Sequence, residues 1–425
     1  MIDHGRSGPQ RAIKSCFLPQ KFMLPWYTFK PFDPSKVDYV NQVILRDLNK
    51  NMTKIFPAMR DEIDIALSMD LPTSTDWSEV DLSAQLLRLI CRVSGRAFVG
   101  SELYGNEQWI DICCKLHQYT KDVFLSALKL RAVPSFLRPL AAMLIPDLYR
   151  VYKHHDRARN LIQPILQQRE QDAENVARYA KPNDTIQWMH DLLPEEDKKD
   201  CALQGALQLA ITAVSVQSTS KLIVNIMLNL MKHIEYVPIL IEEIQPVLAG
   251  CNGEWTLESM THLEKLDSFM RESLRYEPPL TATFQRRVKK PINLSDGTTL
   301  PQNTLVLAPA DAIAFDANLY PNPGQFDGLR FYKLRQQADG GGKAADKVRH
   351  QFVATNKTQV QFGLGRHACP GRWFAGHVIK MVVASVLLKY DLKFKDGEER
   401  PETFLFQTTN MPHPKTRILV RRRTD

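Results

Sequence analysis

The chain has 425 residues, 44% of them hydrophobic, so it can bury a core large enough for one big helical unit or for two or three ordinary domains. Its seven cysteines are odd in number and lack paired metal-type spacing, which argues against a disulfide framework and favours a reducing compartment. The net charge is +8, but only residues 421–423 form a basic run, so we expect an acidic protein partner and no nucleic acid.

The N-terminal segment, residues 1–36, is atypical. Its opening stretch is polar and basic with no apolar run behind it, so we expect neither a signal peptide nor a membrane anchor in this chain. From residue 37 onward, apolar residues recur at three- and four-residue spacing. We therefore predict a mainly α protein with minor β structure, in which residues 37–425 form a single large unit. The predicted helices cover 37–70, 80–98, 107–130, 148–170, 202–232, 235–248 and 258–276.

The longest apolar stretch, residues 202–231, is interrupted by several polar side chains. That pattern fits a long core helix better than a helix that crosses a membrane. Near its middle lie Gln217, Ser218 and Thr219. Hydroxyl groups on a helix either bond back to carbonyl groups of the same helix or face a ligand, and the sequence leaves both readings open.

A pair of opposite charges lies on the last predicted helix of this series. Glu272 and Arg275 are three residues apart, so they face the same way and can form a charge-assisted pair. By itself this spacing is common on surface helices. A third candidate, Arg330, lies in the segment 326–331 between this pair and the cysteine motif described below.

The pattern then changes from helix to strand. Residues 281–307 form short alternating pieces around Ser295-Asp296-Gly297, which predicts a hairpin. The stretch 339–347 is rich in Gly, Ala and Lys, which is typical of a flexible surface loop. A helix to about residue 388 and short strands over 401–420 complete the prediction.

The segment 361–372 reads Gln-Phe-Gly-Leu-Gly-Arg-His-Ala-Cys-Pro-Gly-Arg. Glycines at 363 and 365 allow a tight loop, and Cys369 follows just ahead of an apolar helical pattern. A sulfur at the start of a helix can be held as a thiolate, because the helix dipole and the free N–H groups favour negative charge. A metal ion would complete the deprotonation.

The spacing Phe-x-x-Gly-x-x-x-Cys-x-Gly resembles the haem-binding loop of the cytochrome P450 family. The resemblance covers roughly residues 37–422 and implies the fold of that family, with residues 37–425 as a haem-thiolate monooxygenase domain. It implies haem b as the cofactor, with Cys369 as the axial ligand and Phe362 beside the cofactor. It also implies a buried network of Glu272, Arg275 and Arg330 that holds the cysteine loop against the core.

The resemblance places further residues around the haem. His367 and Arg286 match positions that bind the propionates, and Arg46 is a poorer match for a third partner. On the central helix the family usually has an acid followed by threonine, as a proton relay to bound dioxygen. Here Gln217 stands at the acid position and Ser218 or Thr219 at the alcohol, so a relay would run through hydroxyls and water. Residues near Thr281 to Phe284, the central helix near Ala213, and Phe406 to Asn410 would line the distal pocket.

Several segments look like those of filamentous-fungal monooxygenases of secondary metabolism, including enzymes that act on terpenoids. They are Ser94 to Gly100, Leu137 to Leu140, Ile186 to Met189 and Leu294 to Gly297. The resemblance implies hydroxylation or further oxidation of a lipophilic metabolite, a terpenoid or meroterpenoid being one candidate. Electrons would come from an NADPH-cytochrome reductase. The alternatives are a haem-binding remnant without turnover and a haem-thiolate isomerase or dehydratase.

Eukaryotic members of the family usually begin with a membrane helix, and the sequence as given suggests either a truncated gene or an atypical protein. We expect an intracellular enzyme. The family implies the surface of the endoplasmic reticulum, and the chain as given implies a cytosolic or peripheral protein.

Overall fold

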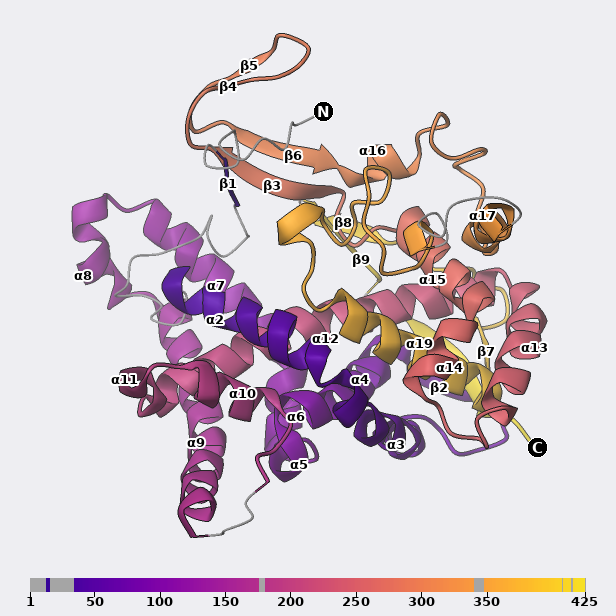
Figure 1. The fold of residues 1–425 in the computed structure, drawn as a ribbon, viewed down its shortest axis with the longest axis horizontal. Helices are drawn as coiled ribbons and strands as arrows, with labels where there is room; N and C mark the ends of the chain where they lie inside the picture. Colours follow the sequence, from indigo (N-terminus) through magenta and orange to yellow (C-terminus); the bar gives the residue numbers. More distant parts are fainter. Residues whose placement is uncertain are drawn as a thin grey trace.

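The computed structural model describes residues 13–15, 34–175, 180–339, 348–406, 408–413 and 416–424. Helices make up most of the described part of the chain, and short strands gather above and beside them (Figure 1). The predicted fold class, mainly α with minor β, is confirmed. The predicted loop at residues 340–347 lies outside the described residues, and Asp339 ends a helix instead of opening that loop.

The first helices are shorter than the sequence pattern predicts. The stretch 37–70 is divided into α2 (Pro34–Gln42), a π-helical turn η3 (Val43–Leu48) and α3 (Met52–Asp70). The division falls at Asn51, whose Nδ2 donates to the carbonyl oxygen of Asp47 at 2.9 Å. A side chain that bonds to the backbone in this way competes with continued helix. The next helices are α4 (Leu82–Phe98), α5 (Gly100–Leu103), α6 (Glu107–Cys114), α7 (Leu116–Arg131), η4 (Ser135–Leu137), α8 (Arg138–Ala142), α9 (Pro146–Asn175), α10 (Thr185–Leu192) and α11 (Glu195–Lys198).

The central helix α12 (Cys201–Lys232) runs through the middle of the molecule (Figure 1). Asp200 caps its first turn by accepting a hydrogen bond from the N–H of Leu203. Gly205 allows α12 to cross α9 closely, since a Cβ there would lie 2.9 Å from the backbone nitrogen of Arg159. This is the one described helix long and apolar enough to cross a membrane, and 67% of its apolar window is buried inside the protein. The predicted core helix is confirmed.

Six further helices follow α12 in the described part of the chain. They are α13 (Tyr236–Ala249), α14 (Leu257–His262), α15 (Glu264–Tyr276), α16 (Ala310–Ala314), α17 (Arg330–Asp339) and α19 (Arg372–Lys389). The predicted helix 258–276 is interrupted at Leu263. The carboxylate of Glu243 accepts the N–H groups of Lys265 and Leu266, at 2.6 and 2.9 Å, and so caps the start of α15.

Four small antiparallel sheets complete the described part of the fold. One has the order β1 (Ile13–Ser15), β3 (Ala282–Val288) and β6 (Leu305–Pro309), so part of the N-terminal segment pairs with the body of the protein. Another has the order β2 (Ser78–Asp81), β10 (Arg417–Arg422) and β7 (Tyr390–Lys393). The two hairpins are β4 (Ile292–Asn293) with β5 (Thr299–Leu300), and β8 (Phe404–Phe406) with β9 (Thr409–Met411). The first of these confirms the predicted hairpin, with Gly297 at φ +84° in its turn.

Candidate functional site

The cysteine loop is closed by its own backbone. The N–H of Cys369 donates to the carbonyl oxygen of Phe362 at 2.6 Å, and α19 begins three residues after the cysteine. Gly363 has φ +76°, and a Cβ there would lie 3.2 Å from the carbonyl oxygen of His367. Only glycine takes this conformation without strain. The ring of Phe362 meets that of Phe352 edge-on at 5.5 Å, which fixes the loop against the core.

The sulfur of Cys369 lies at the N-terminal end of a long helix. Burial raises the pKa of its thiol, whereas hydrogen bonds from the backbone N–H groups of Gly371 and Arg372 lower it. Such donors stabilise a thiolate, and a thiolate is a ligand for a soft metal ion. The thiol is free and half-buried. The residues present therefore suit a metal-bound cofactor at this sulfur.

Two of the predicted cofactor-binding cations lie close together. A register shift between Thr283 and Arg286 bends β3, and Phe284 within it has φ 54°. The bend places the guanidinium of the buried Arg286 over the ring of Phe284 at 4.2 Å. Burial lowers the pKa of His367, and the nearby charge of Arg286 lowers it further. Two cations that repel each other in this way would be stabilised by a bound anion.

The third predicted cation, Arg46, points elsewhere. Its Nη2 pairs with Asp47 at 2.9 Å on the protein surface. The turn that carries it nevertheless contacts the cysteine loop, because Nδ2 of Asn49 donates to the carbonyl oxygen of Pro370 at 3.3 Å. Single π-helical turns such as η3 are frequent at functional sites.

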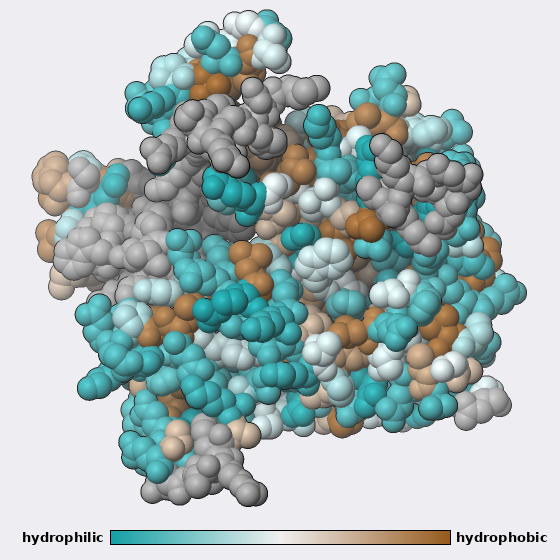
Figure 2. Space-filling view, viewed as in Figure 1, coloured by the Kyte–Doolittle hydropathy of each residue, from teal (hydrophilic) through white to brown (hydrophobic). Residues whose placement is uncertain are grey.

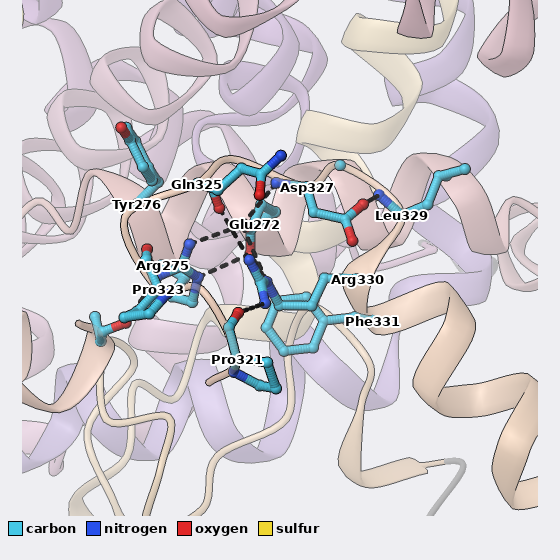
Figure 3. A network of polar contacts seen from close by, with 12 residues as sticks. Glu272, Arg275, Tyr276, Pro321, Pro323, Gln325, Asp327, Leu329, Arg330 and Phe331 are labelled. Atoms are coloured by element: carbon cyan, nitrogen blue, oxygen red, sulfur yellow. Dashed lines mark hydrogen bonds and ion pairs between the residues drawn. The ribbon is translucent and has the colours of Figure 1, made fainter. Parts of the chain in front are cut away.

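The predicted network of Glu272, Arg275 and Arg330 is confirmed (Figure 3). Glu272 is fully buried, and its carboxylate binds Nη2 and Nε of Arg275 at 2.7 and 2.8 Å. It also binds Nε of Arg330 at 3.2 Å and the N–H of Asp327 at 3.0 Å. Both arginines donate further to carbonyl oxygens of the segment 321–325, so one carboxylate joins α15 to the chain that precedes α17.

A second buried carboxylate on α15 holds the segment that leads into the cysteine loop. Asp267 pairs with Arg335 and, at 2.8 Å, with Lys380 of α19, and it accepts the N–H of Phe352 at 2.8 Å. These partners outweigh burial and lower the pKa of Asp267 to about 2. Phe352 in turn packs on Phe362, so this charge cluster supports the loop from behind. The sequence analysis did not identify Asp267.

The central helix presents its polar residues in two ways. The hydroxyl of Ser218 donates to the carbonyl oxygen of Val214 at 2.7 Å, as expected for a hydroxyl that bonds back to its own helix. Thr219 is buried, and Nε2 of Gln217 is buried without a hydrogen-bond partner in the described part of the chain. Val214 is 63% exposed and Ser218 is also exposed, so this face of α12 is uncovered in the middle of an otherwise buried helix. Helix α12 contacts both α15 and α19, which flank the network and the cysteine.

Two of the three segments predicted to line a pocket lie side by side. The N–H of Thr281 donates to the carbonyl oxygen of Thr408 at 2.8 Å, and Leu280 pairs with Thr409. Gln407, within the predicted stretch 406–410, lies outside the described residues. In a neighbouring contact that was not predicted, Nζ of Lys221 on α12 lies 3.6 Å from the sulfur of Met411.

The fold and the loop define a class: a mainly α protein with a glycine-bracketed cysteine at the start of a long helix, beside a long central helix. The cytochrome P450 family model matches residues 38–420. The chain therefore belongs to the cytochrome P450 family, as the sequence motif indicates, and it is a haem-dependent monooxygenase that acts on a lipophilic metabolite.

Relatives in several fungi support this assignment. The chain is 33% identical to the cytochrome P450 monooxygenase olcJ of Penicillium canescens, over 100% of this chain and 78% of that protein. It is 36% identical to the cytochrome P450 monooxygenase BOA4 of Botryotinia fuckeliana, over 91% and 76% of the two chains. It is 31% identical to an ent-kaurene oxidase of Gibberella fujikuroi, over 91% and 74%. Among solved structures, the retinoic acid-bound cyanobacterial CYP120A1 has the same fold, with a TM-score of 0.67 and 17% identity over 98% of this chain and 86% of that chain.

Proposed function

We propose that Cys369 is the axial ligand of haem b in an enzyme that hydroxylates or further oxidises a lipophilic secondary metabolite. The observation that carries this proposal is the cysteine loop itself. Its sulfur accepts two backbone N–H groups at the start of α19, and the 2.6 Å bond to Phe362 fixes its position. When bound, haem supplies the activation of dioxygen, and the protein supplies binding, orientation and protons.

Arg286 and His367 bind the haem propionates in this proposal. Support comes from their proximity, since a bound carboxylate would relieve the repulsion that lowers the pKa of His367. Phe362 packs between the loop and Phe352 and keeps the sulfur from moving. Arg46 is a weaker candidate, because Asp47 already engages its guanidinium.

The proposed substrate is a bulky apolar molecule, with a terpenoid as the first candidate. One relative is named for ent-kaurene, and the chain matches it along most of its length. The uncovered face of α12 near Val214, together with the neighbouring segments around Thr281 and Thr409, would contact the substrate. Apolar and hydroxyl-bearing linings of this kind suit a lipophilic ligand.

We infer an NADPH-cytochrome reductase as the electron donor and the surface of the endoplasmic reticulum as the location. The family uses an external electron donor, and the net charge of +8 favours an acidic partner. An apolar surface over η4 and α8 supports a membrane surface: Phe136, Leu140, Met143 and Leu144 are between 64% and 82% exposed. Brown side chains mark α8 at the left edge of Figure 2. Exposed apolar patches of this kind are typical of interaction sites.

One observation favours a second candidate, a haem-thiolate isomerase or dehydratase that needs no external electrons. Gln217 stands where the family usually has an acid, and the Ser218 hydroxyl is bonded to its own helix. An amide does not titrate at neutral pH and supplies no proton of its own. Product formation that requires no NADPH would identify this alternative.

The ligand assignment is tested by absorption spectroscopy. The wild-type protein, reduced and treated with carbon monoxide, should show the red-shifted Soret band of a thiolate-bound haem. Cys369→His should lose this band, while Cys251→Ser, which changes another free cysteine, should keep it. A Cys369→His protein that retains the band would overturn the assignment.

The catalytic assignment needs a turnover assay. With reductase, NADPH and a panel of terpenoid hydrocarbons, the wild-type protein should form an oxygenated product that depends on NADPH. Ser218→Ala should keep its haem but divert electrons from product to hydrogen peroxide if this hydroxyl serves oxygen activation. Thr219→Val is the alternative variant if the hydroxyl lies one residue further along. An unchanged ratio of product to NADPH in both variants would remove this segment from the relay.

A further inference from the structure

A cavity of about 280 Å³ lies where the C-terminal ends of α12 and α19 meet the sheet β2–β10–β7. These elements are on the right-hand side of Figure 1, beside the labels β7 and β2. Leu387, in the wall of the cavity, lies fifteen residues along α19 from Arg372, which is about 22 Å at ~1.5 Å per residue. The cavity is therefore separate from the cysteine loop and from the segments proposed to contact the substrate.

The floor of this cavity is apolar. Leu230 and Met231, from the end of α12, and Leu387 of α19 line it and are buried. Ile234 and Trp77 also line it, but they are 59% and 37% exposed, so they mark its opening to solvent. A hydrophobic group that displaces water from such a floor gains free energy.

The rim of the cavity is basic. The guanidinium of Arg421 lies 4.6 Å from the ring centroid of Trp77, and Nζ of Lys393 lies 5.1 Å from it. These cation–π contacts hold both cations beside the opening. Arg423 lines the cavity as well. Two members of the basic run 421–423 are thus brought to the rim of an apolar cavity.

One carboxylate serves both arginines of the rim. Asp391 accepts Nε of Arg421 at 3.0 Å and Nε of Arg423 at 2.8 Å. Within the described residues, no hydrogen bond involves the terminal nitrogens of either guanidinium group. Lys393 pairs at 3.0 Å with Asp396, which is 92% exposed, and a pair in water is weak. Three cations therefore face one carboxylate of the lining, and their remaining N–H groups are available to an anion.

We propose that this cavity is a binding site for a small single-chain amphiphile with an anionic head, a carboxylate or a phosphate. The chain lies on Leu230 and Leu387, and the head binds the terminal nitrogens of Arg421 and Arg423. An apolar cavity with a few convergent polar groups is the usual form of a ligand site. This inference goes beyond the proposed function and does not depend on it.

The size and charge of the cavity select this class of ligand. Its volume of about 280 Å³ lies near the lower end of the range for ligand pockets, about 300–1,000 Å³, so one short chain fits and a two-chain lipid does not. A neutral chain leaves the terminal nitrogens of the arginines without an acceptor. A small anion without a chain leaves the apolar floor in contact with water. A ligand that carries both parts satisfies both surfaces.

Photolabelling of the full chain locates the site. The probe is decanoate with a diazirine at the end of its chain, and the labelled residues are identified by mass spectrometry. The label should fall on the segments 230–237 and 387–393, and unlabelled decanoate should compete with it. Decanol has the same chain without the charge, and acetate has the charge without the chain, so each should compete at least tenfold less well. A label confined to other segments would overturn the proposal.

The role of the rim is tested by removing its charge. The double variant Arg421→Gln/Arg423→Gln should bind decanoate about tenfold or more weakly, since a lost hydrogen bond to a charged group has an effect of this size. Its affinity for decanol should not change. Arg417→Gln is the matched control, because Arg417 lies on the same strand but pairs with Glu79 and does not line the cavity. This control should bind decanoate as wild type does.

The role of the cavity is tested by blocking its opening. Ile234→Trp adds a large side chain at an exposed position, so the fold should be preserved while the label on 387–393 is lost. The control Ile65→Trp makes the same change at a position of α3 that is 50% exposed and does not line the cavity. It should keep the label. Unchanged labelling in both variants would show that decanoate does not enter the cavity.

Other outcomes also reject the proposal. If decanol competes as well as decanoate, or if the double arginine variant keeps the affinity of wild type for decanoate, the basic rim does not bind the ligand. If vesicles that contain phosphatidylserine bind to this surface while decanoate does not, it is a membrane contact. The thiolate Soret band tests the proposed function separately, so the failure of one inference is distinguishable from the failure of the other.

Discussion

The buried carboxylates of α15 and the buried amides of α12 are treated in opposite ways, although the two helices touch each other. On α15 the carboxylates of Glu272 and Asp267 are surrounded by arginine, lysine and backbone donors. On α12 the amides of Gln217 and Asn225 keep atoms that have no hydrogen-bond partner in the described part of the chain. Fully bonded charges fix a geometry, whereas unbonded polar groups do not. We infer that the protein is more rigid around the buried carboxylates of α15 than around these amides of α12.

Removing the carboxylate of Glu272 should have the largest effect. In Glu272→Ala, two buried guanidinium groups lose their counter-charge, which costs about 3–5 kcal/mol. We expect little soluble, haem-loaded protein and a large loss in the free energy of unfolding measured with urea. The control Glu258→Ala, which removes an exposed carboxylate of α14, should stay within ~0.5 kcal/mol of wild type. Normal stability with selectively lowered turnover would contradict a structural role for Glu272.

Acid should weaken the support provided by Asp267. The pKa of this carboxyl is lowered from 3.8 to about 2, so its contribution to stability is complete above pH 3.8 and is lost as the pH falls toward 2. The shift corresponds to about 2 kcal/mol, at ~1.4 kcal/mol per pKa unit. The free energy of unfolding should be measured from neutral to acid pH for wild type and for Asp267→Asn. The difference between the two proteins should shrink by this amount as the pH falls. A constant difference would mean that the ion pairs of Asp267 add no pH-dependent stability.

The backbone of the cysteine loop should respond more weakly. Gly363→Ala forces a side chain into the left-handed region, at about 1–2 kcal/mol, and brings its Cβ to 3.2 Å from the carbonyl oxygen of His367. We expect lower haem occupancy and a lower midpoint of thermal unfolding. Gly105→Ala is the matched control, because a Cβ there meets no atom within 4 Å. Equal haem occupancy in both variants would show that the cysteine loop can adjust to the added side chain.

The smallest expected change in stability has the opposite sign. Asn225→Leu removes a buried atom that has no hydrogen-bond partner in the described part of the chain, so it should raise the free energy of unfolding by about 1 kcal/mol. Thr212→Val removes a bonded hydroxyl from the same helix and should lower stability by a similar amount. Urea denaturation of the two variants measures this contrast directly. If both lose stability equally, Asn225 is satisfied within the protein and the contrast with α15 disappears.

Much of the fold can be predicted from the sequence, because apolar residues that recur at helical spacing indicate which face of a helix is buried. The helix at 202–232 and the network of Glu272, Arg275 and Arg330 were predicted in this way, the first from spacing and the second from a family motif. The breaks at Asn51 and Leu263 were not predicted. The first depends on a local side-chain bond that competes with helix, and the second on the capping of α15 by Glu243, which lies on another helix.

The site is less accessible to sequence reasoning. Cys369 could be singled out because glycines and a helix start bracket it. The left-handed Phe284 and the position of Arg286 over its ring arise from a bend in β3 that no residue type predicts. The unbonded amides of Gln217 and Asn225 on α12 were not predicted either, since a buried amide without a partner is a property of packing. Asp267 was not predicted because its ion pairs with Arg335 and Lys380 also depend on packing.

The sheet β2–β10–β7 has a consequence for biosynthesis. Its middle strand is β10, and Arg417 reaches Glu79 across 338 residues of chain. Strand β2 therefore leaves the ribosome long before β10, which must lie between β2 and β7. Until β10 arrives, the edges of β2 and β7 stay unpaired, and such edges favour aggregation. Slow translation or a chaperone that shields these edges should improve the yield of folded protein more than any change at the haem site.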